Sequence, residues 1–168
     1  RLYFQGESYW KRYGAQTRQL PPIRKMLDLG LPVGLGTDGT RVSSYGPWPS
    51  IYWAVTGKTA GGLATWQAKD VLSRHEALHL MTRGSAWMSG EEDVKGRLTV
   101  GQYADFAVLP QDYFTMDVEK IKDLESVLTV VNGQVVYGAG DFGKLSPALP
   151  AVSPAWSPVK HFGGYQNR

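Results

Sequence analysis

The fold class is decided by the stretch Leu31-Pro32-Val33-Gly34-Leu35-Gly36-Thr37-Asp38-Gly39. Residues 31–36 are mostly apolar and lie between chain-breaking residues, which predicts a short strand buried on both faces. A helix is predicted just before it, over residues 21–29, because prolines suit its first turn, apolar residues recur on one face and Gly30 can close it. Helix, short turn and buried strand indicate an α/β fold, in which ligands gather at the carboxyl ends of the strands. Asp38 follows such an end and is therefore a candidate site residue.

Two further helices are predicted downstream. The first covers residues 48–55 and is opened by prolines at positions 47 and 49, with its apolar residues on one side. The second begins at Ser73, because Glu76 three residues on and Leu72 just before it form a capping-box pattern. Gly84 is expected to end this second helix.

Strands and turns dominate the sequence beyond Gly84. Strands are predicted over residues 97–100 and 104–109, and a hairpin is centred on Asn132-Gly133 between residues 127–131 and 134–137. The Asn-Gly pair suits a two-residue turn with positive φ angles, so the flanking strands should be antiparallel neighbours. Residues 144–158 carry most of the late prolines and predict an extended tail.

Composition excludes several classes of protein. The chain has 168 residues, 42% hydrophobic and 20% charged, which is typical of a globular domain with one core. The net charge of +3 is spread without long basic runs, so nucleic acid is not a favoured partner. No stretch approaches the ~18 apolar residues that span a bilayer, so no membrane partner is expected. With no cysteine and no signal peptide in view, the compartment stays unknown, with the cytoplasm favoured over the periplasm.

A zinc-peptidase motif is present in His75-Glu76-Ala77-Leu78-His79. Two histidines four residues apart on a helix can share a zinc ion, and the glutamate between them can act as a general base. Here, however, the helix begins only two residues earlier, Glu76 already has a capping role, and no third ligand follows. A solvated helix face is the favoured interpretation, and a zinc metallopeptidase using His75, Glu76 and His79 remains an alternative.

A longer match concerns most of the chain. The run Gly96-Arg97-Leu98-Thr99-Val100-Gly101-Gln102-Tyr103-Ala104-Asp105-Phe106 follows residues 21–38, 47–57 and 72–87 in a fixed order. In that order these stretches resemble the third family of the amidohydrolase superfamily, a branch of metal-dependent hydrolases. Residues 21–38 look like its last barrel helix and strand, residues 72–87 and 95–109 like its passage into a small β domain, and residues 127–138 like the final strands.

The resemblance implies a fold and a division of the chain. We expect the terminal part of a (β/α) barrel in residues 1–88, a small β-rich domain in residues 89–141 and an extended proline-rich tail in residues 142–168. It also implies hydrolysis of amide-type, non-peptide C–N bonds, with one or two divalent metals, zinc being favoured. By position Asp38 is the family's aspartate after the last strand, which touches the metal and exchanges a proton with the hydrolytic water.

The remaining metal ligands of the family lie on earlier barrel strands. No His-x-His pair occurs in this sequence, so this chain is expected to be a C-terminal fragment that neither holds the metal nor turns over substrate alone. For a small-molecule substrate, the loop after Asp38 offers recognition candidates, with a purely structural loop as the alternative. These candidates are Arg41, Ser44, Tyr45 and Trp48.

Two further expectations concern partners and the chain start. A barrel end exposes apolar surface and an unpaired strand edge, so it should associate with the missing N-terminal barrel portion or with itself. A non-catalytic α/β domain that binds a partner is therefore a further alternative. Residues 1–6 resemble a protease-site remnant, and a native segment is the equal alternative.

Overall fold

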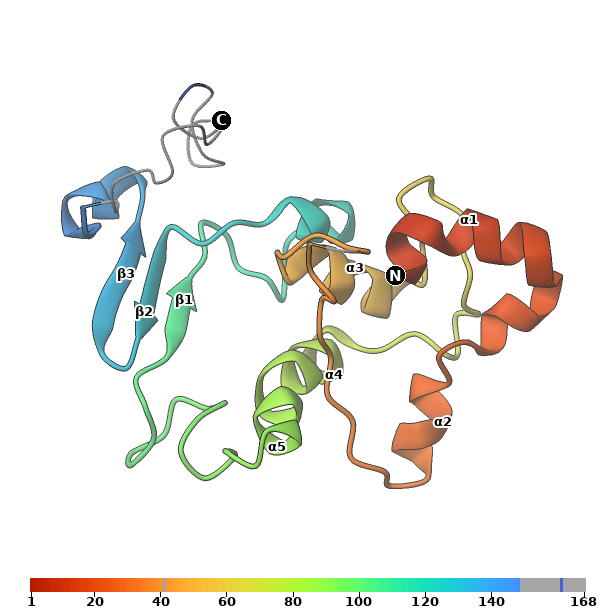
Figure 1. Ribbon diagram of the computed structural model, residues 1–168, viewed down its shortest axis with the longest axis horizontal. Coiled ribbons are helices and arrows are strands. Elements are labelled where there is room, and N and C mark those ends of the chain that lie inside the picture. The colour runs from red at the N-terminus through yellow and green to blue at the C-terminus, as the bar shows by residue number, and fades with distance from the viewer. Residues whose placement is uncertain (41, 149–160, 162–168) are drawn as a thin grey trace.

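Helices make up the first half of the chain and a small sheet the second, as Figure 1 shows. The computed structural model describes residues 1–40, 42–148 and 161. The helical elements are α1 (Leu2–Tyr13), η1 (Gly14–Gln19), α2 (Ile23–Asp28), α3 (Trp48–Thr56), α4 (Arg74–His79), the π-helical η2 (Leu80–Gly84), α5 (Ser85–Met88), η3 (Val118–Asp123) and η4 (Gly140–Leu145). The strands are β1 (Phe106–Val108), β2 (Leu128–Val131) and β3 (Gln134–Gly138).

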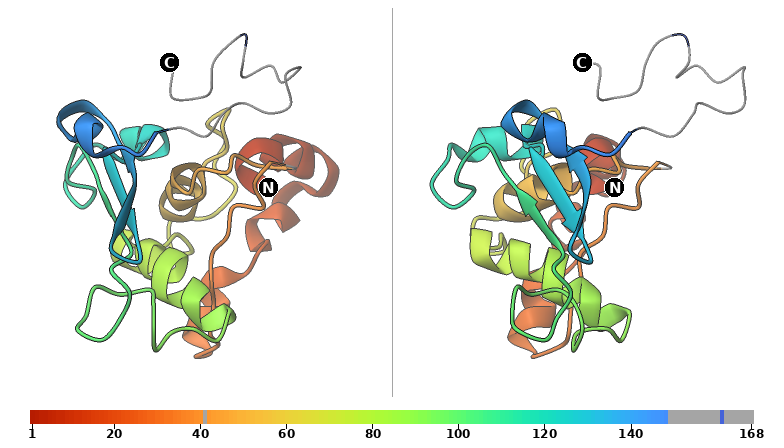
Figure 2. Two further views of the ribbon diagram at one scale, coloured as in Figure 1. Left: turned by 60° about the vertical axis from the view of Figure 1, so that its left-hand side comes forward. Right: turned by 90° about the vertical axis from the view of Figure 1, so that its left-hand side faces the viewer.

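Helix α3 is the centre of the core. Its residues Ile51, Tyr52 and Ala54 are almost fully buried, and it packs against α1, α4 and η3. The Trp53 and Trp66 rings lie with their centroids 4.1 Å apart, so large aromatic surfaces fill the space beside the helix. Figure 2 shows α3 between the N-terminal helices and the sheet. The predicted apolar side of this helix is confirmed.

A charged cluster fastens η3 to α3. The Glu119 carboxylate accepts hydrogen bonds from Lys58 and from the Tyr52 hydroxyl, both at 2.7 Å, and from Lys122 at 3.3 Å. The Lys58 ammonium is the largest of the causes that lower the pKa of Glu119 to about 2. The apolar contact between the two elements is thus bordered by ion pairs at the surface.

The sheet is antiparallel with β2 in the middle. At the turn between β2 and β3, Asn132 has φ 49° and Gly133 φ 74°, so the predicted hairpin is confirmed with the backbone that Asn-Gly favours. The Asn132 N–H also donates to Asp105 Oδ1 at 2.7 Å, which ties the turn to the residue before β1. The sheet therefore forms as a meander from consecutive strands.

Three local predictions were wrong. Residues 31–36 are extended, but they form no ladder because the described part of the chain offers no neighbouring strand. Residues 97–100 are irregular, with Leu98 and Val100 exposed, and they pair with no strand in the described part of the chain. The helix from Ser73 does not end at Gly84 but continues through a π-helical turn to Met88. Its predicted capping box at Ser73 and Glu76 is present.

The N-terminal segment belongs to the folded body. Leu2 and Gly6 are buried, and a Cβ added to Gly6 would lie 2.3 Å from the Thr59 side chain. Residues 1–6, for which a protease-site remnant was one interpretation, thus pack within helix α1. Most of the expected tail lies outside the described residues, and none of the described helices has the length and apolar character needed to cross a membrane.

Candidate active site

The loop that follows the extended segment carries Asp38 in an unusual backbone conformation. Asp38 has φ 50° and Thr40 φ 72°, both in the left-handed region. Aspartate enters this region more readily than most residues, whereas a β-branched threonine does so rarely. Such conformations cost about 1–3 kcal/mol each and cluster at functional sites. The strain at this loop agrees with a functional role for its exposed carboxylate.

Hydrogen bonds inside the loop hold this conformation. The Gly39 N–H donates to Thr37 Oγ1 at 3.1 Å, and the Thr40 N–H donates to the Ser43 carbonyl at 3.1 Å. A Cβ on Gly39 would lie 2.7 Å from the Tyr45 Cα, so the chain returns directly onto the residue after Asp38. The loop is a closed turn that presents Asp38 at its surface.

Arg1, at the start of α1, lies close to this loop. A hydrogen bond with Tyr9 is the main cause that raises the pKa of the Arg1 guanidinium, and the Asp38 carboxylate contributes to the same shift. The Arg1 guanidinium and the Asp38 carboxylate are therefore close enough to interact electrostatically.

The other predicted recognition residues divide into two groups. Ser44 and Tyr45 lie in the Asp38 loop, where the Ser44 hydroxyl accepts a hydrogen bond from the Gly46 N–H at 3.1 Å. Trp48 lies away from Asp38 at the start of α3, with its ring centroid 5.6 Å from that of Tyr113. Arg41 falls outside the described residues. The structure thus brings Ser44 and Tyr45 near Asp38 and directs Trp48 elsewhere.

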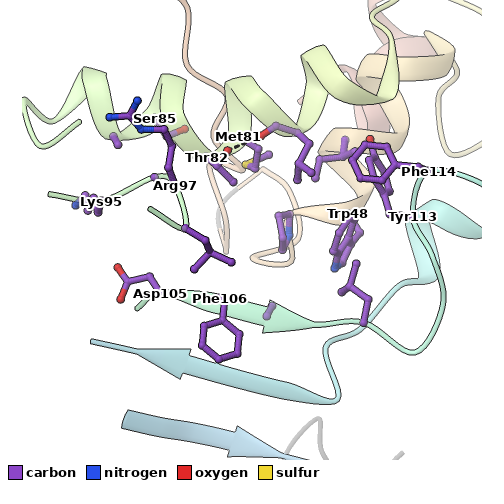
Figure 3. A pocket seen from close by; sticks show the side chains of 18 of the residues that line it. Trp48, Met81, Thr82, Ser85, Lys95, Arg97, Asp105, Phe106, Tyr113 and Phe114 are labelled. Carbon is purple, nitrogen blue, oxygen red and sulfur yellow. Dashed lines mark hydrogen bonds between the residues drawn. The ribbon is translucent and has the colours of Figure 1, made fainter. Parts of the chain in front are cut away.

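Trp48 faces a cavity of about 950 Å³ between the α4 to α5 helix and β1. Figure 3 shows Trp48, Tyr113 and Phe114 at one end, and Lys95, Arg97 and Asp105 at the other. This cavity could not be predicted from the sequence, because its walls come from segments far apart in the chain. Aromatic and aliphatic side chains dominate the lining, with Lys95, Arg97 and Asp105 at one end and Asp112 next to Tyr113 in the sequence.

The histidine motif is arranged as a structural element. Two guanidinium nitrogens of Arg24 donate to Glu76, at 2.8 and 2.9 Å, and this pair is the main cause that lowers the Glu76 pKa to about 2. His75 stacks on Phe114 with ring centroids 4.4 Å apart, and His79 is exposed. Glu76 is thus engaged with α2 and its own helix N-terminus, which leaves it poorly placed as a general base.

No cluster that could hold a metal is found within residues 1–40, 42–148 and 161. Three or more His, Cys, Asp or Glu side chains nowhere come together there. A catalytic zinc needs about three protein ligands, and the described residues do not bring such a set together.

Comparison with known sequences extends over most of the chain. The sequence model of the amidohydrolase family matches residues 2–137. N-substituted formamide deformylase of Arthrobacter pascens is 28% identical over 128 residues, which are 76% of this chain and 23% of that protein. YtcJ of Bacillus subtilis (strain 168), named as an amidohydrolase, is 38% identical over 73 residues, which are 44% of this chain and 14% of that protein.

Solved structures give a consistent result. Atrazine chlorohydrolase TrzN from Arthrobacter aurescens TC1, complexed with zinc, matches with a TM-score of 0.55 and 29% identity over 77% of this chain and 29% of that chain. A triazine hydrolase variant matches with a TM-score of 0.54 and 28% identity over the same shares. This chain spans less than a third of the length of each of these proteins.

Proposed function

Because the chain belongs to the amidohydrolase family, we propose that it is the C-terminal portion of a metal-dependent hydrolase acting on amide-type, non-peptide C–N bonds. The Arthrobacter pascens relative is named as a formamide deformylase, which supports this bond type. TrzN is named as a chlorohydrolase, so the leaving group varies among similar proteins. The observation that carries the proposal is the strained, exposed Asp38 directly after an extended segment, inside the matched residues.

The proposed role of Asp38 follows from the chemistry of a carboxylate. It would contribute one oxygen ligand to a divalent metal, with zinc favoured by the zinc-bound neighbour. It would also accept the proton of the water that attacks the substrate carbon. The metal supplies Lewis-acid activation of that water. Ser44 and Tyr45, from the same loop, are proposed to contact the substrate beside Asp38.

The other ligands are proposed to come from an upstream barrel portion. On this proposal residues 1–88 complete that barrel, residues 89–141 form the small β domain and residues 142–168 form the tail. The isolated 168-residue chain is then expected to show no metal-dependent turnover above background. Chelator-sensitive hydrolysis of an amide, lactam or hydantoin panel by this chain with added zinc or manganese would contradict the fragment proposal.

The decisive experiment exchanges Asp38 in the full-length enzyme. Asp38→Asn keeps the shape but removes the charge and the basic oxygen, so turnover should fall by about 10²–10⁴-fold, with weaker metal binding. Asp28→Asn, an exposed carboxylate at the end of α2, is the matched control and should leave turnover unchanged. Turnover and melting temperature are measured on the same preparations. Near-normal turnover in Asp38→Asn would remove this residue from the site.

A second candidate function is binding of a protein partner. Leu98 and Val100 are among the most exposed apolar residues, and they lie in the turn segment before β1, beside the cavity. Exposed apolar patches of this kind mark association surfaces. Light scattering over a concentration series distinguishes the possibilities: self-association that Leu98→Asp abolishes supports a second copy as the partner. A monomer at all concentrations would rule out a second copy as the partner.

A further inference from the structure

One face of the α4 to α5 helix holds the extended segment that leads to Asp38. The Leu35 N–H donates to the Leu80 carbonyl at 3.0 Å, and the Ser85 hydroxyl donates to the Leu35 carbonyl at 2.6 Å. Ser85 Oγ also lies 3.1 Å from the Leu80 carbonyl oxygen, so it contacts both residues of the Leu35–Leu80 backbone hydrogen bond. The two backbone groups of Leu35 are thus satisfied by a helix instead of a neighbouring strand.

Two glycines allow the helix and the segment to approach this closely. A Cβ on Gly84 would lie 2.3 Å from the Val33 carbonyl oxygen, and a Cβ on Gly34 would lie 3.0 Å from the Gly84 carbonyl oxygen. Neither space can hold a methyl group without a shift of backbone. Gly84 lies in the π-helical turn η2, and such turns are frequently found at functional sites.

This contact is the nearest anchor of the Asp38 loop. Within the described part of the chain, Leu35 is the only residue of 32–37 whose backbone N–H and C=O both have partners. Asp38 follows three residues later, so a shift of Leu35 along the helix would carry the carboxylate with it. Catalytic groups must be held to within about 0.5 Å by supporting contacts of this kind.

We propose that Ser85 is a positioning residue: its hydroxyl, at the π-helical turn, fixes Leu35 and thereby the place of the Asp38 carboxylate. That Ser85 places Asp38 for catalysis rests on the proposed function, whereas the anchoring of Leu35 by Ser85 does not. Loss of one hydrogen bond of this type corresponds to a change of about 2- to 12-fold in an equilibrium.

The anchoring is tested on the 168-residue chain by amide hydrogen exchange. Ser85→Ala should speed exchange of the Leu35 amide by about 2- to 12-fold, whereas Ser85→Thr, which keeps the hydroxyl, should restore slow exchange. Ser89→Ala is the matched control, because the Ser89 side chain hydrogen-bonds the Ala86 carbonyl and the Glu91 carboxylate, both outside residues 31–38. Unchanged Leu35 exchange in Ser85→Ala, or equal acceleration in Ser89→Ala, would overturn the proposal.

The positioning role is tested in the full-length enzyme. Ser85→Ala should lower kcat and weaken zinc binding by a similar 2- to 12-fold factor at unchanged melting temperature, and Ser85→Thr should restore both. Fast exchange at Leu35 with unchanged kcat and zinc affinity would refute positioning and leave only anchoring. Failure of the Asp38→Asn test with intact Leu35 anchoring would instead refute the proposed function. Failure of the positioning proposal and failure of the proposed function therefore give different experimental results.

Discussion

Glu76→Gln should remove the strongest ion pair between α2 and α4 while keeping the shape of the capping box. The pKa of Glu76 lies at about 2 against an ordinary 4.5, with Arg24 as the main cause. That difference corresponds to at most about 3 kcal/mol. The Glu76 side chain is 37% exposed, so solvent screening reduces the expected loss to roughly 1–2 kcal/mol at pH 7.

The effect of Glu76→Gln on stability should depend on pH. A lowered folded-state pKa means that the ionised pair stabilises the fold above about pH 4.5, and that this contribution is lost as the pH falls toward 2. Urea unfolding followed by tryptophan fluorescence should therefore show a smaller effect of Glu76→Gln at pH 3 than at pH 7. Glu91→Gln, at an i,i+4 pair with Lys95, is the control and should destabilise the chain much less than Glu76→Gln. An equal loss at both pH values, or none at pH 7, would refute the assignment.

Two further predictions concern the same helix. Gly84→Ala should lower the free energy of unfolding by about 1–3 kcal/mol in urea titration despite the better helix propensity of alanine, because its Cβ meets the Val33 carbonyl. Gly143→Ala, which has open space, should not lower it, and a Gly84→Ala chain as stable as the wild type would disprove the close approach. The His75→Ala, His79→Ala double variant should bind zinc no more weakly than the original chain in calorimetric titration, since Glu76 is held by Arg24 and the described residues offer no third ligand nearby. Stoichiometric sub-micromolar binding lost in the double variant would restore the peptidase alternative.

Local signals in the sequence predicted the elements that depend on local physics. The capping box at Ser73, the hairpin at Asn132 and the apolar side of α3 involve residues within a few positions of each other. The strand over residues 31–36 was mispredicted because pairing needs neighbours that the described residues do not supply. Helix α1 was missed, although Leu2 and Gly6 are spaced by four and Gly14 follows its end.

The candidate site was predictable only in part. Asp38 could be selected because its position after an apolar run and the family resemblance agree, and its left-handed backbone adds an independent sign. The anchoring by Ser85 could not be seen, since it joins residues 50 positions apart. Likewise, the engagement of Glu76 with Arg24 spans 52 positions, and the sequence showed only its capping role.

The π-helical turn η2 also constrains how many residues the α4 to α5 helix can contain before Ser85. Each helical residue turns the chain by about 100°, so removing one residue from η2 would swing Ser85 away from Leu35 without changing any side chain that touches the segment. Among natural variants, insertions and deletions should therefore avoid residues 80–84, a pattern of gaps that substitution alone would not reveal.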